Sequence, residues 1–329
     1  LFSMLFGMGF AVMMQRAELA GRPFLGLYLR RIGALLVIGL VHVVFIWSGD
    51  ILVTYAMMGF LLGLLFRGTP QSRLPKWGAA LMLLPVAFMM LLGLVGTLMK
   101  ALPDEKRAGF DQAMAEQAQQ TAALIEAQRL AYGSGTFMEA TAQRLADFGM
   151  MIGFVVIFGA FILGLFLVGA WFTRSGAIAR PEQHAGVFAR LRWVALPLGL
   201  AMVLGSYWLV PTLDYNRLDL MASGAQVLQM LGGAVVALGY LAWFVRGLQS
   251  PVLGRFLGLL APAGRMALTN YLMQSLVCTW IFFGYGLGYF EQLPRAWQPL
   301  FVLALFGLQV ALSHWWLARF RFGPMEWLW

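Results

Sequence analysis

Four ionisable residues lie in or beside one strongly apolar hairpin near the start of the chain. Arg30 and Arg31 precede an apolar stretch that contains His42, and Asp50 follows that stretch. An ionisable side chain inside a bilayer costs at least about 2.5 kcal/mol, so such residues are functional candidates by default. A neutral imidazole in a dry site can accept a proton from a hydroxyl nucleophile or carry an acyl group itself. His42 and Asp50 are therefore the candidate catalytic residues.

The position of His42 in the membrane follows from helix geometry. At about 1.5 Å per residue from Arg31, His42 lies about 16 Å deep, near the bilayer midplane, and Asp50 about 12 Å further out. At that separation we expect Asp50 to orient His42 only through water or another residue. The next apolar segment brings Tyr55 back toward His42. Catalysis requires the imidazole to face a hydrated cleft, and a structural histidine bonded to a neighbouring helix is the alternative.

The composition predicts an all-α protein, a polytopic transmembrane helix bundle that forms one domain over residues 1–329. Apolar residues make up 61% of the chain and charged residues only 11%. A helical span needs about 20 apolar residues. About nine segments approach that length: 1–14, 32–48, 51–66, 77–99, 148–172, 193–211, 225–245, 266–284 and 297–318. The first is too short to cross, and the chain opens at Leu1 rather than Met, so we expect a cut N-terminus.

The basic residues predict the orientation, because Lys and Arg near span ends stay on the cytoplasmic side. One set of alternate connections, which includes the C-terminus, carries 16 of the 23 basic residues and three of the 14 acidic ones. We therefore expect a cytoplasmic C-terminus. The net charge of +9 then reflects this sidedness. Membrane lipids are the expected partners, nucleic acid is not expected, and a homo-oligomer is left open.

The long polar stretch 100–147 is predicted to be a mostly helical insertion on the outer side. It is rich in Ala, Gln and Glu and has no proline after Pro103, and Gly133, Ser134 and Gly135 divide it in two. Its apolar stripe is narrow, so it is not expected to cross the bilayer. A lid over an outward-facing cavity and a solvated helical hairpin are the two interpretations.

A second polar group opens the segment 266–284. Asn270 and Gln274 share one helix face, with Arg265 and Tyr271 close by. These side chains either bond to neighbouring helices or line a cavity, and Arg265 could bind an anionic group near the cytoplasmic end. No cluster of His, Cys, Asp and Glu has metal-ligand spacing, so no metal site is predicted. His184 and His314 lie in a basic loop and near a span end, where histidine is ordinary.

At these residues the chain resembles the YeiB-like family of bacterial inner-membrane proteins, catalogued as domain of unknown function 418. The similarity is carried by Phe2, Ser3, Phe6, Gly7 and Gly9; by Arg30, Arg31, Ile38, Gly39 and His42; by Trp47, Gly49, Asp50, Ile51, Leu52, Tyr55 and Ala56; by Gly264 through Ser275; by Gly284, Tyr285, Gly286 and Gly288; and by Gly323, Pro324, Glu326 and Trp327. The family's opening span, with its Leu-Asp and Arg-Gly residues, is missing here.

The resemblance implies roughly ten spans in the full family protein and a distant similarity to transmembrane acyltransferases. Such enzymes pass an acyl group from a cytoplasmic thioester, such as a coenzyme A thioester, to an outward-facing envelope acceptor. By that analogy His42 is the base or transient acyl carrier and Asp50 its outer-side orienter. Arg30, Arg31 and Arg265 would bind donor phosphates, although positive-inside anchoring explains them equally. A transporter or lipid flippase is the alternative, and a non-catalytic envelope scaffold is a third hypothesis.

Overall fold

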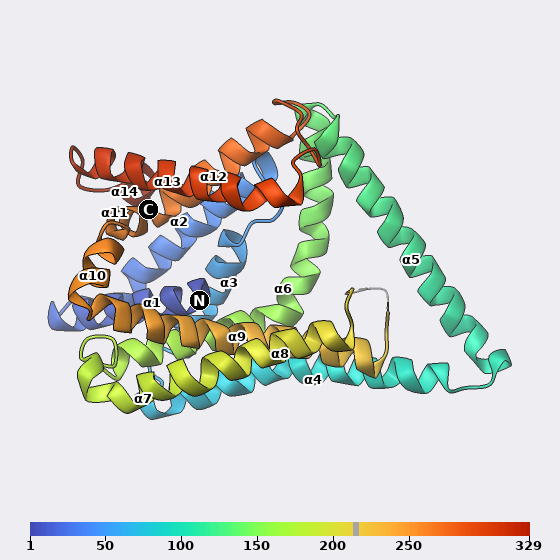
Figure 1. Ribbon diagram of the computed structural model, residues 1–329, viewed down its shortest axis with the longest axis horizontal. Helices are drawn as coiled ribbons and strands as arrows, with labels where there is room; N and C mark the ends of the chain where they lie inside the picture. The colour runs from blue at the N-terminus through green and yellow to red at the C-terminus, as the bar shows by residue number, and fades with distance from the viewer. Residues whose placement is uncertain (213–216) are drawn as a thin grey trace. The chain divides into compact units, whose positions relative to one another are not determined.

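The computed structural model describes residues 1–212 and 217–329, and the regular structure within those residues is entirely helical (Figure 1). Besides short 3-10 and π-helical turns, the α-helices are α1 (Phe2–Leu19), α2 (Phe24–Phe45), α3 (Leu52–Leu65), α4 (Leu74–Lys100), α5 (Asp104–Gly133), α6 (Phe137–Arg174), α7 (Ala185–Arg190), α8 (Leu196–Leu209), α9 (Leu220–Leu248), α10 (Pro251–Gly258), α11 (Ala261–Arg265), α12 (Ala267–Phe282), α13 (Gln298–Leu317) and α14 (Pro324–Leu328). The predicted all-α class is confirmed.

Among residues 1–212 and 217–329, six helical segments are long and apolar enough to cross a membrane, which makes this a multi-pass membrane protein. They are Phe24–Phe45, Gln71–Lys100, Phe137–Arg174, Pro181–Leu209, Leu220–Leu248 and Arg295–Leu317. The other three of the nine predicted spans are too short or too weakly apolar to be counted among these six. The segment 1–14 belongs to α1, and α3 and α12 have only 14 and 16 residues. Short helices such as α3 and α12 reach across a bilayer only in part, at about 1.5 Å per residue.

The polar stretch 100–147 is helical and broken where the glycines predict. α5 ends at Gly133, and α6 begins at Phe137. The mean apolarity of α5 is low, and it is not among the candidate spans. One boundary differs from the prediction, because α6 continues without a break from residue 137 to Arg174. Residues 137–147 are therefore the first turns of a long helix, and no loop separates the insertion from the span.

The chain groups into two compact units. Residues 1–29, 57–121 and 154–246 form the first, and residues 30–56, 122–153 and 247–329 form the second. In the first unit, glycines let helices pack closely. A side chain at Gly7 of α1 would clash with the backbone of Phe166 in α6, and one at Gly169 would clash with Met4. Small residues of this kind are typical of helix contacts in membranes. The prediction of a single domain over 1–329 stays a prediction.

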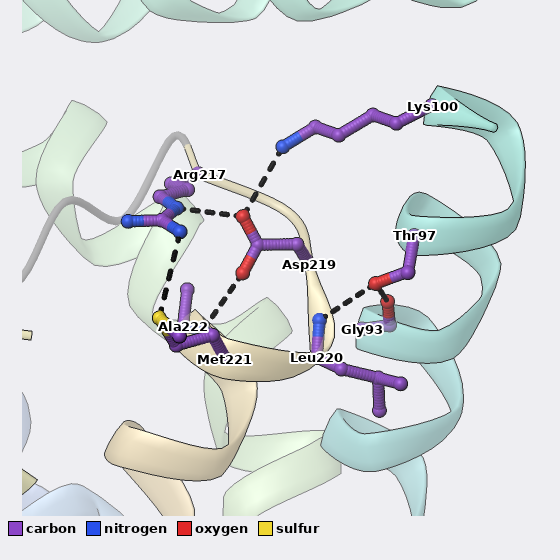
Figure 2. A network of polar contacts seen from close by, with 8 residues as sticks. All are labelled: Gly93, Thr97, Lys100, Arg217, Asp219, Leu220, Met221 and Ala222. Carbon is purple, nitrogen blue, oxygen red and sulfur yellow. Dashed lines mark hydrogen bonds and ion pairs between the residues drawn. The ribbon is translucent and has the colours of Figure 1, made fainter. Parts of the chain in front are cut away.

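A polar network joins the start of α9 to the end of α4 within the first unit (Figure 2). One oxygen of Asp219 accepts a hydrogen bond from the Ala222 amide, and the other lies 3.2 Å from Lys100 Nζ and 2.6 Å from Arg217 Nε. The Leu220 amide donates to Thr97 Oγ1 over 2.9 Å. Asp219 therefore supplies an acceptor to amides that every helix leaves unpaired at its N-terminus.

The second unit contains most of α2, the turn after it, the first residues of α3 and most of the C-terminal third. α2 and α3 approach closely at Gly39, where a Cβ would meet the backbone of Val53. α14 folds back onto the start of α12, where Glu326 accepts hydrogen bonds from the amide and hydroxyl of Thr269. Trp329 donates through its indole to the carbonyl of Arg31. These contacts fix the end of α12 that leads into the candidate site.

Candidate functional site

The turn between α2 and α3 brings the two catalytic candidates together. α2 ends at Phe45, and the amides of Ile46 and Trp47 both donate to the carbonyl of His42. Because the chain folds back directly after this turn, Asp50 returns to the level of His42. The expectation that Asp50 lies too far away for direct contact is therefore wrong. It assumed a helix that continues along its axis to Asp50, whereas the helix stops five residues earlier.

His42 and Asp50 form a direct buried pair. His42 Nδ1 lies 2.8 Å from Asp50 Oδ1. The other carboxylate oxygen, Oδ2, accepts a hydrogen bond from the Val53 amide over 2.7 Å, so Asp50 also caps the start of α3. His42 is 0% exposed and Asp50 3%. When the carboxylate is ionised and the imidazole is neutral, the carboxylate can only accept, so the ring proton lies on Nδ1 and Nε2 carries a lone pair.

The unprotonated nitrogen has no hydrogen-bond partner. His42 Nε2 is buried and unpaired within the described residues. Burying a polar atom without a hydrogen-bond partner lowers the folding stability by about 1–3 kcal/mol, and such atoms in native proteins often have a functional role. A general base needs this arrangement. The carboxylate of Asp50 orients the imidazole through Nδ1, and Nε2 is free to accept a proton from the reacting group.

Two aromatic rings flank the imidazole. Tyr271 of α12 lies with its ring centroid 5.1 Å from that of His42, and Trp47 lies edge-on at 6.4 Å. The Tyr271 hydroxyl accepts a hydrogen bond from the Ile51 amide at 3.3 Å. Tyr55 is buried in the first turn of α3. The prediction that the ring itself faces an open, hydrated cleft is wrong, because these aromatic neighbours and the turn cover it completely.

A cavity lies against the two aromatic neighbours of the pair. It has a volume of about 620 Å³, and Trp47, Tyr271 and Gln274 are among its lining residues. Trp47 and Tyr271 lie between this cavity and the buried imidazole, so access to Nε2 from the cavity requires one of these side chains to move. Rotations of partly exposed side chains are fast on the timescale of turnover.

The polar residues of α12 divide between the two roles that the sequence left open. Asn270 donates to Ser313 Oγ of α13 at 3.0 Å and to the Ala263 carbonyl, while Gln309 donates to the Asn270 carbonyl. Asn270 therefore joins helices and does not line the cavity. Tyr271 and Gln274, by contrast, do line it.

The three candidate donor-binding arginines lie away from the pair, in the same unit. The Arg31 guanidinium stacks 4.5 Å over the ring of Trp329, and Arg265 donates to the carbonyl of Arg321. Arg30 is exposed. The C-terminal segment 321–329 thus contacts both Arg31 and Arg265. Arg31 lies about 16 Å from His42 along α2. The structure does not bring these arginines to the catalytic pair.

Comparison with known proteins identifies the family. Residues 172–329 match the model of the family described as "Protein of unknown function (DUF418)". The chain is 36% identical over 340 residues to the uncharacterized protein YxaH of Bacillus subtilis (strain 168), covering 100% of this chain and 77% of YxaH. It is 31% identical over 333 residues to the uncharacterized protein YeiB of Escherichia coli (strain K12), covering 100% of this chain and 79% of YeiB. The chain belongs to the DUF418 family. No solved structure matches it.

Sequence reasoning missed the residue that holds the outer end of the hairpin in this DUF418 chain. Arg144 of α6 is fully buried and donates from Nε to the Val44 carbonyl at 2.9 Å and from Nη1 to the Ile46 carbonyl at 3.3 Å. It thereby pairs carbonyls that the end of α2 leaves unsatisfied. A single arginine one turn before an apolar span was the only available signal. Its partners, the carbonyls of Val44 and Ile46, lie about a hundred residues earlier, so the sequence around Arg144 does not indicate them.

A second unpredicted contact ties the end of α5 to the same turn. The Tyr132 hydroxyl contacts Asp147 of α6 and Ser48 of the turn. Burial raises the pKa of the Tyr132 hydroxyl, and the hydrogen bond to Asp147 raises it further, so it remains a neutral donor. The end of α5 and the start of α6 therefore pack on the hairpin turn, while most of α5 is exposed. The lid and the solvated hairpin both stay predictions. Within the described residues, no group of three His, Cys, Asp or Glu side chains could hold a metal ion.

Proposed function

We propose that this protein is an acyltransferase of the bacterial inner membrane that moves an acyl group from a cytoplasmic thioester to an envelope acceptor bearing a hydroxyl. The observation that carries the proposal is the direct His42–Asp50 pair with its unpaired Nε2, whose aromatic neighbours Trp47 and Tyr271 line a cavity. An imidazole held by a carboxylate through one nitrogen is a general base through the other.

The proposed reaction uses His42 as a proton carrier. Nε2 of His42 accepts the proton of the acceptor's hydroxyl group while the hydroxyl oxygen attacks the carbonyl carbon of the thioester. The tetrahedral intermediate collapses, the carbon–sulfur bond breaks, and the imidazolium returns the proton to the leaving thiolate. The products are an ester and a free thiol. Asp50 keeps the imidazole in the reactive orientation and stabilises its protonated form.

The donor side of the proposal rests on the arginines at the other end of the same unit. Arg30, Arg31 and Arg265 carry positive charge around the C-terminal segment, where Glu326 is already bonded to Thr269. Guanidinium groups suit the phosphates of coenzyme A. The long, flexible arm of that donor could then extend toward His42 while its charged end stays outside the apolar layer.

Acyl transfer by purified protein tests the proposal. Labelled acetyl-coenzyme A is incubated with the protein and envelope extract, and labelled acceptor is counted. His42→Ala is expected to lower transfer by at least about a hundredfold, the usual contribution of a general base. His184→Ala removes a partly exposed histidine outside the site and serves as the matched control. Undiminished transfer by His42→Ala would refute the role of His42.

A transporter or lipid flippase is the second candidate, favoured by the half-open cavity that adjoins a buried titratable pair. In that case His42 would carry a proton coupled to substrate movement, and uptake should follow the pH gradient. Reconstituted vesicles distinguish the two functions, because a transporter moves unmodified substrate whereas an acyltransferase yields a covalent product and free thiol.

A further inference from the structure

The cavity next to His42 runs along one face of α12, where polar side chains recur at helical spacing. Tyr271, Gln274, Ser275 and Thr279 all line it. Residues three, four and eight positions apart lie on the same side of a helix. Between Tyr271 and Phe283 this face extends for about 18 Å. The cavity therefore follows this face of α12 and includes Tyr271, the aromatic neighbour of His42.

The hydroxyl groups on this face can accept hydrogen bonds from a ligand but have no proton to give. Ser275 Oγ donates to the Tyr271 carbonyl at 3.2 Å, and Thr279 Oγ1 donates to the Leu276 carbonyl at 3.2 Å. A hydroxyl has one proton and two lone pairs. Both oxygens consequently offer only lone pairs to the cavity. A ligand that satisfies them must be a hydrogen-bond donor.

The rest of the lining is dominated by aromatic rings. Phe282, Phe283, Tyr289, Phe290 and Phe301 contribute to it. Aromatic faces carry partial negative charge and attract the slightly positive C–H groups of an apolar surface. The cavity thus combines a row of acceptors with ring faces that suit a C–H-rich body.

The charge of the lining disfavours anionic ligands. Glu291 is the one Asp, Glu, Lys, Arg or His among the described lining residues, and its carboxylate lies 3.2 Å from Arg129 Nε. A phosphate or carboxylate ligand would find no cation there. A simple alkyl chain would make no hydrogen bond to Ser275, Thr279 or Gln274, whereas a ligand with hydroxyl groups would gain those bonds.

We propose that this cavity binds the acceptor as a neutral polyol, such as a sugar ring with free hydroxyls. Its hydroxyls donate to Ser275 and Thr279, the amide of Gln274 both donates and accepts, and its C–H faces lie on the aromatic rings. The hydroxyl nearest Tyr271 is the one that reaches His42. The last point rests on the proposed acyl transfer, whereas the binding of a polyol does not.

Binding by the full chain tests this assignment without requiring any reaction. The protein is reconstituted in lipid nanodiscs free of sugar-based detergent, and maltose is the probe in saturation-transfer difference NMR. We expect maltose to be bound, and Thr279→Val and Gln274→Ala each to weaken binding by about three- to tenfold, the usual effect of one hydrogen bond. Thr121→Val is the matched control, because Thr121 of α5 makes the same bond to its own helix outside this cavity.

Two further probes identify the chemistry that is recognised. Glucose 6-phosphate should bind more weakly than maltose, and n-octanol should not compete with it. Absence of maltose binding, insensitivity to both cavity variants, or displacement of maltose by n-octanol would overturn the proposal.

The variant His42→Ala separates this inference from the proposed function. If it binds maltose normally but transfers no acyl group, both stand. If it binds maltose normally and still transfers acyl groups, the catalytic role of His42 fails and the polyol site remains.

Discussion

At the scale of single residues, Asp50 has two roles that can be separated by mutation. One oxygen orients His42, and the other accepts from the Val53 amide at the start of α3. Asparagine retains a carbonyl that can cap the helix but loses the charge that stabilises an imidazolium. Alanine loses both.

We therefore predict different effects for Asp50→Asn and Asp50→Ala. Asp50→Asn should lower acyl transfer by about 10²- to 10⁴-fold while changing the unfolding free energy little. Asp50→Ala should lose similar activity and also about 1–2 kcal/mol of stability, as loss of a helix cap does. Acyl transfer and denaturant unfolding in detergent measure the two effects. Wild-type activity in Asp50→Asn would contradict the orienting role.

At the scale of helices, Arg144 determines how the end of α2 is held. Its guanidinium donates to two carbonyls beyond the last turn and to Thr141 Oγ1 at 2.7 Å. Arg144→Met keeps most of the volume but leaves the carbonyls unpaired. We expect it to lower the unfolding free energy by about 2–4 kcal/mol.

Arg107→Met is the control for that experiment. Arg107 pairs with Asp104 and Asp111 on the surface of α5, and surface ion pairs contribute about 0–1 kcal/mol. Hydrogen exchange at the amides of Ile46 and Trp47 should accelerate in Arg144→Met only. Equal stability of the two variants would show that Arg144 does not hold the turn.

The network at the start of α9 predicts an acid-sensitive contact (Figure 2). Burial by itself would raise the pKa of Asp219, but the hydrogen bond from Ala222 and the contacts with Arg217 and Lys100 outweigh it and lower the pKa from 3.8 to about 2. A lowered folded-state pKa stabilises the protein above pH 3.8, and the contribution is lost as the pH falls through about 2.

The corresponding variant is Asp219→Asn, which keeps a cap but no charge. We expect it to cost about 1–2 kcal/mol at pH 7, with the difference from wild type shrinking between about pH 4 and pH 2. Unfolding curves across that range measure it. A difference that is constant with pH would show that the charge of Asp219 contributes nothing.

The same helices show what could be predicted from sequence and what could not. The break between α5 and α6 was predictable because Gly133 and Gly135 act locally. His42 and Asp50 were identifiable because a polar group in an apolar stretch is conspicuous. Their direct contact was not, since it depends on where α2 ends and how the turn folds back. Arg144 was missed because its partners lie far away along the chain and follow no periodic pattern.

At the scale of the whole molecule, the charges at the helix ends support one orientation. Arg30 and Arg31 lie in the first turns of α2, Arg174 is the last residue of α6, and Arg246 lies near the end of α9. In an alternating path these positions fall on one side. The opposite connections hold most of the acidic residues, including those of α5. From the positive-inside rule we predict a cytoplasmic C-terminus and an outward-facing α5.

Labelling of introduced cysteines tests that orientation. With the natural Cys278 replaced by alanine, Gln119→Cys in α5 and Glu182→Cys in the basic connection before α7 place one exposed thiol on each expected side. A membrane-impermeant maleimide should modify Gln119→Cys in intact cells and Glu182→Cys only after lysis, because the charged reagent cannot cross the apolar layer. The reverse labelling pattern would show that the protein has the opposite orientation. The arginines near the C-terminus would then face away from the cytoplasm and could not bind a cytoplasmic donor.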